Sequence, residues 1–130
     1  MHPLTGLITL LTVLLLMVMM ALVARARGQH NVKAPATTGP EGFERCFRVQ
    51  MNTQESALMF LPALWTAAAF SLPWLAAVVG AVWLLARAWY AVAYLDPAKS
   101  RAVPFTLSVL ALLALVGQGL WGVGWTLVLR

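Results

Sequence analysis

The chain has 130 residues, of which 62% are hydrophobic and 10% are charged, with nine lysines and arginines against four acidic residues. Soluble domains are about half apolar and one quarter charged, so this composition excludes an ordinary soluble domain and predicts one integral-membrane domain over residues 1–130. The net charge of +5 does not indicate nucleic-acid binding, since basic residues beside apolar segments set membrane topology, and one cysteine excludes an internal disulfide.

The first predicted helix covers about residues 3–27. The stretch from Leu4 to Ala24 is apolar and follows a start without basic residues. A signal peptide has a basic start and an apolar core of roughly 7–15 residues, so this segment does not fit one. We expect a retained transmembrane helix, because about 20 apolar residues are enough to cross a bilayer.

The second and third predicted helices, about residues 39–70 and 73–95, divide a long uncharged stretch from Ala57 to Ala86. Pro73 marks the division, since proline interrupts a helix and favours the start of the next one. Each half is short for a membrane span, so each helix must include polar residues at its outer end. An antiparallel pair brings these two ends to the same side, which predicts a polar pocket near one membrane face.

The start of the second helix carries a capping pattern. Thr38 is expected to cap the helix together with Glu41 three residues later. The pairs Glu41–Arg45 and Glu44–Arg48 then follow at a spacing of four, with the glutamate first, which is the favourable order in a helix. The helix is therefore expected to project from the membrane before it enters the bilayer.

The fourth predicted helix covers about residues 100–129. Pro104 must lie in its first turn, because a proline deeper in a helix clashes with the preceding turn. Arg101 then lies where the helix is already partly positive, which is mildly unfavourable. A nearby anion reverses that sign, so Arg101 predicts an anionic ligand or a developing thiolate.

Basic residues predict the orientation. Eight of the nine lysines and arginines flank the first or the third connection, and the connection at residues 71–74 has none. The positive-inside rule therefore places the first and third loops in the cytoplasm and both termini outside. The eight residues are Arg25, Arg27, Lys33, Arg45, Arg48, Arg87, Lys99 and Arg101.

Polar residues recur at helical spacing inside the apolar chain. Arg48, Asn52 and Glu55 share one helix face, and Tyr90 and Tyr94 share another. Ionisable residues within a membrane segment indicate a functional site. Together these groups suit a small ligand with carboxylates, an amine and amides, such as glutathione, a phospholipid head group or an anionic metabolite. A structural polar network between helices and an aromatic belt are the alternatives. His2 and His30 lie in separate segments, so no metal site is expected.

Two segments resemble the MAPEG family, the membrane-associated proteins in eicosanoid and glutathione metabolism. They are PATTGPEGFERCFRVQMNTQESALMFLPALW and ARAWYAVAYLDPAKSRAVPF. The combination R-x-x-x-N-x-x-E, then Y-x-x-x-Y, then an arginine is specific, the likeness covers about residues 25–105, and small bacterial members are the most similar subset. The resemblance implies an all-α fold, a left-handed bundle of four transmembrane helices, assembled as a homotrimer in a bacterial inner membrane.

The resemblance also implies glutathione as co-substrate, bound between neighbouring subunits near the cytosolic face. Its expected contacts are Arg48, Asn52 and Glu55 on the second helix, Tyr90 and Tyr94 on the third, and Arg27 and Gln50 at the boundary with the neighbouring subunit. Arg101 matches the arginine that stabilises the glutathione thiolate, and is therefore the expected catalytic residue.

Two positions depart from the leukotriene-forming synthase of the family. Ser56 stands where that enzyme has a tyrosine, and Gly28 where it has a second arginine, so leukotriene synthesis is not supported. The expected activity is transfer of the glutathione thiolate to lipophilic electrophiles dissolved among membrane lipids, with reduction of lipid peroxides as a second activity. The alternatives are a non-enzymatic lipid- or ligand-binding scaffold, and an enzyme that uses another thiol.

Overall fold

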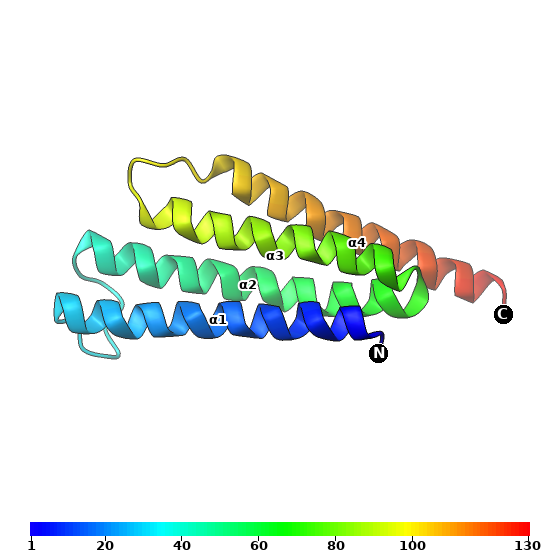
Figure 1. The fold of residues 1–130 in the computed structure, drawn as a ribbon, viewed down its shortest axis with the longest axis horizontal. Coiled ribbons are helices and arrows are strands. Elements are labelled where there is room, and N and C mark those ends of the chain that lie inside the picture. Colours follow the sequence, from blue (N-terminus) through cyan, green and yellow to red (C-terminus); the bar gives the residue numbers. More distant parts are fainter.

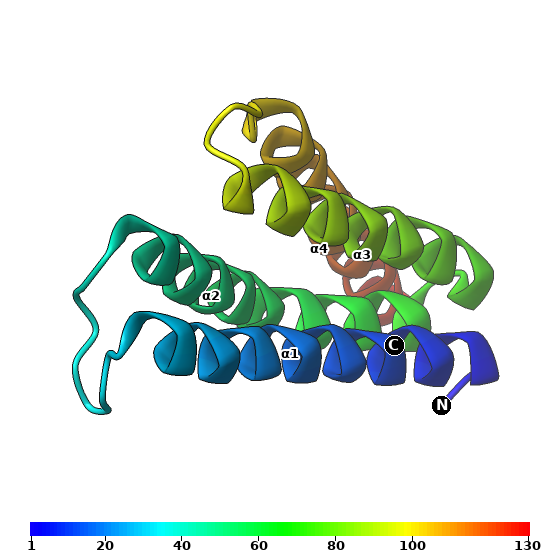
Figure 2. The same cartoon turned by 60° about the vertical axis from the view of Figure 1, so that its left-hand side comes forward.

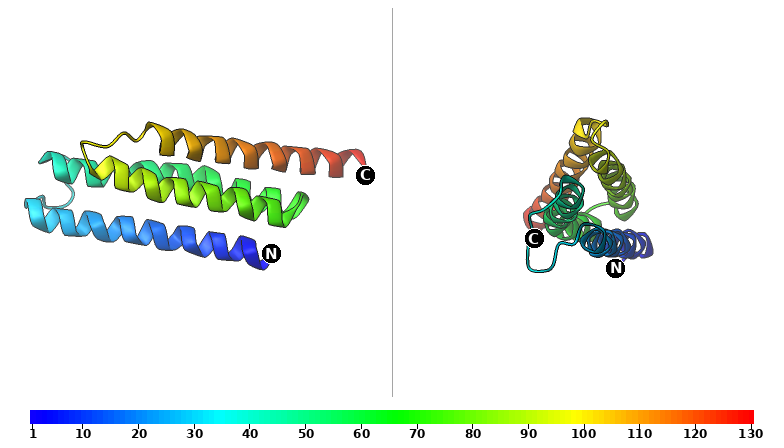
Figure 3. Two further views of the ribbon diagram at one scale, coloured as in Figure 1. Left: turned by 45° about the horizontal axis from the view of Figure 1, so that its top comes forward. Right: turned by 90° about the vertical axis from the view of Figure 1, so that its left-hand side faces the viewer.

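The computed structural model describes all 130 residues and contains four helices. They are α1 (Pro3–His30), α2 (Glu41–Phe70), α3 (Pro73–Leu95) and α4 (Ala102–Val128). The helices run alongside one another in an elongated bundle (Figure 1). Helices α2 and α3 contact each other and both outer helices, whereas α1 and α4 lie apart on different sides of the bundle (Figure 3). The predicted all-helical fold is confirmed.

Three of the four helices, α1, α3 and α4, are long and apolar enough to cross a membrane. Helix α2 has 30 residues but falls outside this group, because its first half carries charged and polar side chains. Many large apolar side chains point away from the bundle, including Leu58, Leu85 and Leu120, each about 70% exposed. Such an outer surface suits contact with lipid, as expected for a multi-pass membrane protein.

The first connection differs in detail from its prediction. Helix α1 continues to His30, three residues beyond the expected end, and Asn31 ends it in the left-handed conformation. The predicted Thr38 cap is wrong, since Pro40 occupies the cap position of α2 and no side chain caps this end. The Oε1 atom of Glu44 instead accepts a hydrogen bond from the Gly39 N–H at 3.3 Å.

Of the two ion pairs predicted at the start of α2, one forms and one does not. Arg45 Nε lies 2.9 Å from Glu41 Oε1, so the first pair is confirmed. The second pair, Glu44–Arg48, does not form, because the Glu44 carboxylate turns back to the loop.

Small residues allow α4 to approach the end of α2. A Cβ atom added at Gly122 would collide with the backbone carbonyl of Phe70, and one added at Gly119 would touch the Ala67 backbone at 3.5 Å. Gln118 Nε2 also donates to Ser71 Oγ at 2.9 Å and to the Leu72 carbonyl at 3.1 Å. The end of α2 and the turn that follows it are therefore both in close contact with α4.

The largest of three buried apolar clusters lies in the same half of the bundle and extends to its middle, and the two smaller clusters lie nearer the long loops. The rings of Phe60 and Trp83 stack with centroids 3.8 Å apart and planes 5° apart, beside fully buried Leu64 and Leu115. Trp83 Nε1 donates to Ser56 Oγ at 3.1 Å, so the buried indole has a polar partner. Beyond this layer, towards the two long loops, the α1–α2 pair diverges from the α3–α4 pair (Figure 2). Arg48, Asn52, Tyr90 and Tyr94 lie towards that diverging end.

Candidate functional site

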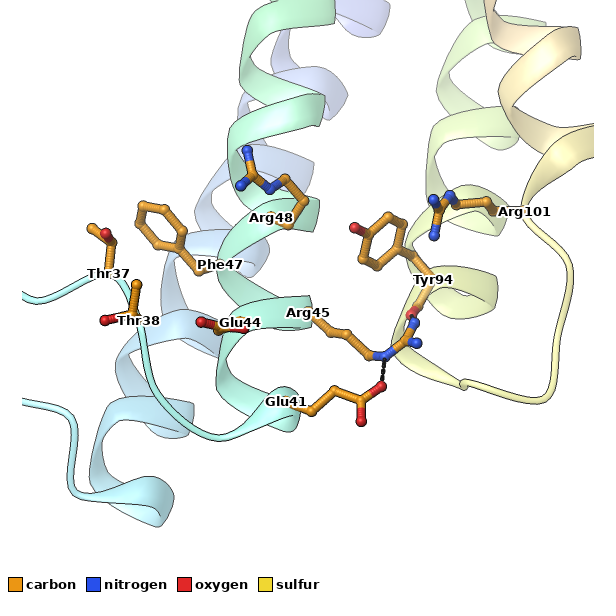
Figure 4. Close-up of a pocket in the computed structure, with 9 residues that line it drawn as sticks. All are labelled: Thr37, Thr38, Glu41, Glu44, Arg45, Phe47, Arg48, Tyr94 and Arg101. Carbon is orange, nitrogen blue, oxygen red and sulfur yellow. Dashed lines mark hydrogen bonds and ion pairs between the residues drawn. The ribbon is translucent and has the colours of Figure 1, made fainter.

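Two adjoining pockets lie where α2, the end of α3 and the α3–α4 loop meet. The larger, here called the cationic pocket, has a volume of about 620 Å³. The smaller, called the rim pocket, has about 340 Å³ and includes the α1–α2 loop (Figure 4). The cationic pocket is lined by Arg48, Asn52, Tyr90, Tyr94, Lys99, Ser100, Arg101, Ala102 and Phe105. The rim pocket is lined by Thr37, Thr38, Glu41, Glu44, Arg45, Phe47, Arg48, Tyr94 and Arg101.

A direct hydrogen bond joins the polar ends of α2 and α3. Asn52 Nδ2 donates to the Tyr90 hydroxyl oxygen at 2.9 Å, although the two residues are 38 positions apart in sequence. The Tyr90 ring lies 5.6 Å from that of Tyr94 and 6.1 Å from that of Phe105, centroid to centroid. The predicted meeting of these two helix ends is confirmed, and both tyrosines line the cationic pocket.

Arg101 lies at the mouth of both pockets. Its guanidinium carbon is 4.4 Å from the centre of the Tyr94 ring, a distance typical of a cation–π contact. The residue is exposed and stands immediately before α4. No carboxylate pairs with it, since Arg45–Glu41 is the one ion pair in the chain. Its N–H donors are therefore free to bind an anion.

Arg45 on α2 links this helix to the end of α3 beside the rim pocket. Besides its pair with Glu41, its Nη1 atom donates to the Tyr94 carbonyl at 3.1 Å, and its guanidinium carbon lies 5.8 Å from the Tyr94 ring. Sequence reasoning assigned Arg45 to topology and to the Glu41 pair. Its position one turn before Arg48 could have indicated that it belongs to the site. Its contact with α3, however, could not be predicted without the tertiary structure.

Arg87, a polar residue of the third helix to which the sequence assigns no ligand role, lines neither pocket but lies behind the pocket wall. It is 2% exposed, and its guanidinium carbon lies 4.2 Å from the Tyr90 ring. Its terminal nitrogens donate to Thr53 Oγ1 at 3.3 Å and to Ser108 Oγ at 3.4 Å, while the buried Nε atom has no partner. Arg87 thus links α2, α3 and α4 beneath Tyr90 without a carboxylate partner.

Three of the expected glutathione contacts do not line either pocket. Arg27 Nη1 donates to the Ala36 carbonyl at 2.8 Å, and its guanidinium lies 5.0 Å from the Phe43 ring, so it orders the first loop. Glu55 is exposed on α2, and Gln50 is partly buried there. The pockets bring together Arg48, Asn52, Tyr90, Tyr94 and Arg101.

The types of side chain around the two pockets indicate which ligands could bind there. The chain has no group of three or more histidine, cysteine, aspartate or glutamate side chains placed to hold a metal ion. Cys46 is buried away from both pockets. The side chains of the cationic pocket are guanidinium, ammonium, amide and hydroxyl groups, which bind carboxylates and other anions.

The Asn52–Tyr90 bond leads to a prediction for stability. Replacing Tyr90 by phenylalanine removes the acceptor of a partly buried amide, so we expect a loss of about 1 kcal/mol in the free energy of unfolding. The measurement is unfolding of the detergent-solubilised protein by sodium dodecyl sulphate. Tyr94→Phe is the control, because no hydrogen bond of that hydroxyl is present and its effect should stay within about 0.5 kcal/mol. Equal losses in the two variants would contradict the assignment.

Known proteins match the chain along most of its length. Residues 5–121 match the model of the MAPEG family. An uncharacterized protein of Synechocystis is 46% identical over 94% of this chain and 89% of its own length. Leukotriene C4 synthase of Cavia porcellus is 41% identical over 87% of this chain and 77% of its own. Microsomal glutathione S-transferase 2 of Homo sapiens is 39% identical over 73% of this chain and 66% of its own.

Proposed function

The chain belongs to the MAPEG family, and on that premise we propose that it is a membrane-bound glutathione transferase that joins the glutathione thiolate to lipophilic electrophiles. The names of two similar proteins, a leukotriene C4 synthase and a microsomal glutathione S-transferase, support a glutathione-dependent activity. The departures at Ser56 and Gly28 favour a general transferase over leukotriene synthesis.

The observation that carries the proposal is the unpaired Arg101 at the mouth of the cationic pocket. Glutathione brings two carboxylates and a thiol, and the pocket offers Arg48 and Arg101 without any carboxylate among its lining residues. Asn52 adds an amide that suits the peptide backbone of the ligand. The conjunction of free cations and amide groups matches a small anionic peptide better than an apolar lipid tail.

The proposed chemistry begins with the thiol proton. A free thiol has a pKa of about 8.5 and is mostly protonated at neutral pH. A guanidinium within about 4–6 Å favours the thiolate and lowers that pKa, and the proton leaves to water. The thiolate sulfur then donates an electron pair to an electrophilic carbon, forming a C–S bond as the leaving group departs with its bonding electrons. Reduction of a lipid hydroperoxide uses the same thiolate with a second glutathione, giving the alcohol, water and glutathione disulfide.

The remaining expected contacts belong to a trimer in this proposal. Arg27 and Gln50 would reach glutathione from a neighbouring copy, and Glu55 would take its ammonium group. Their position outside the pockets of a single chain is compatible with such a boundary. The clustering of eight basic residues beside the first and third loops supports a cytoplasmic site. The likeness to a Synechocystis protein suits the inner membrane of a bacterium. The electrophile would enter from the bilayer.

The test is a titration of the purified, detergent-solubilised protein with glutathione, followed by the ultraviolet absorbance of the thiolate. We expect a saturable thiolate signal in the wild type and none in Arg101→Ala. Binding without a thiolate signal would favour the non-enzymatic scaffold. An absence of binding would show that the chain shares the fold of the family without this ligand, and would direct the search to another thiol.

A further inference from the structure

The cationic pocket contains three positive side chains, Arg48, Lys99 and Arg101, and no negative one. The chain has four acidic residues in all, and each of them is placed elsewhere. Glu41 pairs with Arg45, Glu44 accepts the Gly39 N–H, and Glu55 is exposed on α2 outside both pockets. The fourth, Asp96, lies in the loop that leads to Lys99. Glu41 and Glu44 line the adjoining rim pocket, but neither forms an ion pair with Arg48, Lys99 or Arg101.

The α3–α4 loop presents Lys99 to the pocket through a defined turn. Asp96 Oδ1 accepts the Ala98 N–H at 2.9 Å, and the Lys99 N–H donates to the Asp96 carbonyl at 3.1 Å. The Asp96 carboxylate thus serves the backbone of its own turn and forms no ion pair with the lysine. Lys99, Ser100 and Arg101 follow one another along the pocket wall.

The two ends of glutathione differ in a way that this charge distribution can distinguish. At the γ-glutamyl end a carboxylate stands beside an ammonium group, whereas the glycyl end carries a carboxylate alone. A pocket with only positive charges repels the ammonium group and attracts the isolated carboxylate. With Arg101 assigned to the sulfur, Arg48 and Lys99 remain for this carboxylate.

We propose that Lys99 binds the glycyl carboxylate of glutathione and selects thiols in which that carboxylate is free, an inference that rests on the proposed function. Lys99 is thereby a specificity-determining residue at the edge of the pocket. A thiol whose terminal carboxylate is esterified loses this contact but keeps its thiol and its γ-glutamyl group.

The test compares two ligands and three proteins by isothermal titration calorimetry in detergent. The ligands are glutathione and its glycyl monoethyl ester, and the proteins are the wild type, Lys99→Met and Lys33→Met. We expect Lys99→Met to weaken glutathione binding about five- to tenfold and to leave ester binding within about twofold of the wild type. Lys33 carries the same charge in the first loop and lines neither pocket, so its variant should bind both ligands as the wild type does.

The outcomes separate this inference from the proposed function. Unchanged glutathione affinity in Lys99→Met, or equal losses for the two ligands, would overturn the role of Lys99 and leave the glutathione site standing. A wild type that binds neither ligand would overturn the proposed function and this inference with it. Lys99→Arg retains the charge, so it should restore most of the preference for glutathione over its ester.

Discussion

Replacing Arg101 by alanine is expected to lower turnover of glutathione with a lipophilic electrophile by about 10²- to 10³-fold near pH 7. Arg101 has no carboxylate partner and lies at the mouth shared by both pockets, so its positive charge is available to the sulfur. Glutathione affinity should change by less than about fivefold, because Arg48 and Lys99 remain for the glycyl carboxylate. The effect is therefore expected in kcat, with a smaller change in KM.

The dependence of this loss on pH gives the sharper measurement. On the proposed mechanism the thiol pKa is lowered in the wild type, so the thiolate is expected to be present already at neutral pH. In Arg101→Ala the thiolate forms only as the pH rises towards about 8.5, so the difference between the two proteins should narrow there. Arg130→Ala is the matched control, since Arg130 lines neither pocket. Equal turnover in wild type and Arg101→Ala at neutral pH would refute the catalytic assignment.

The largest effect on stability is expected at Gly122. A methyl group at this position would overlap the Phe70 carbonyl oxygen and lie 2.6 Å from its carbonyl carbon, and neither backbone atom can rotate away as a side chain can. Gly122→Ala should therefore lower the free energy of unfolding by about 2–3 kcal/mol, a loss typical of overpacking, even though alanine is the better helix former.

Gly124→Ala provides the matched control for this prediction. An added Cβ at Gly124 meets no atom within 4 Å, so only the gain in helix propensity of up to about 1 kcal/mol should remain. Unfolding of both variants by sodium dodecyl sulphate gives the comparison. If Gly122→Ala proved as stable as Gly124→Ala, the close approach of α4 to the end of α2 would be wrong.

Much of the fold followed from two simple features of the sequence. Pro73 divided an apolar stretch that was too long for one helix, and the shortness of each half required polar helix ends on one side. The Asn52–Tyr90 hydrogen bond is where those ends meet. The Thr38 cap was predicted wrongly because a capping pattern considers only the types of side chain. In the structure Pro40 occupies the cap position, and the Glu44 carboxylate accepts the hydrogen bond from the loop.

The site was predictable to the extent that helical spacing identifies a shared face. Arg48 and Asn52 were found in this way, and they lie in one pocket with Tyr90, Tyr94 and Arg101. Spacing gives a direction around the helix axis but not the neighbour that covers it. Spacing therefore could not predict that Arg45 donates to the Tyr94 carbonyl. Nor could it predict that Gly122 lies against the end of α2. The ligand-binding and catalytic roles of all these pocket residues stay predictions, and so do those of Arg27, Gln50 and Glu55, which lie outside both pockets.

The hydrogen bond between Trp83 and Ser56 constrains how this sequence can evolve. Trp83 is completely buried, and its indole N–H depends on the serine hydroxyl 3.1 Å away. A single change of Ser56 to the tyrosine of the leukotriene-forming synthase would remove that acceptor and add volume beside a filled core. Trp83→Phe, which needs no acceptor, would have to come first. Positions 56 and 83 should therefore vary together among descendants of this chain, and the order of the two substitutions decides which intermediate still folds.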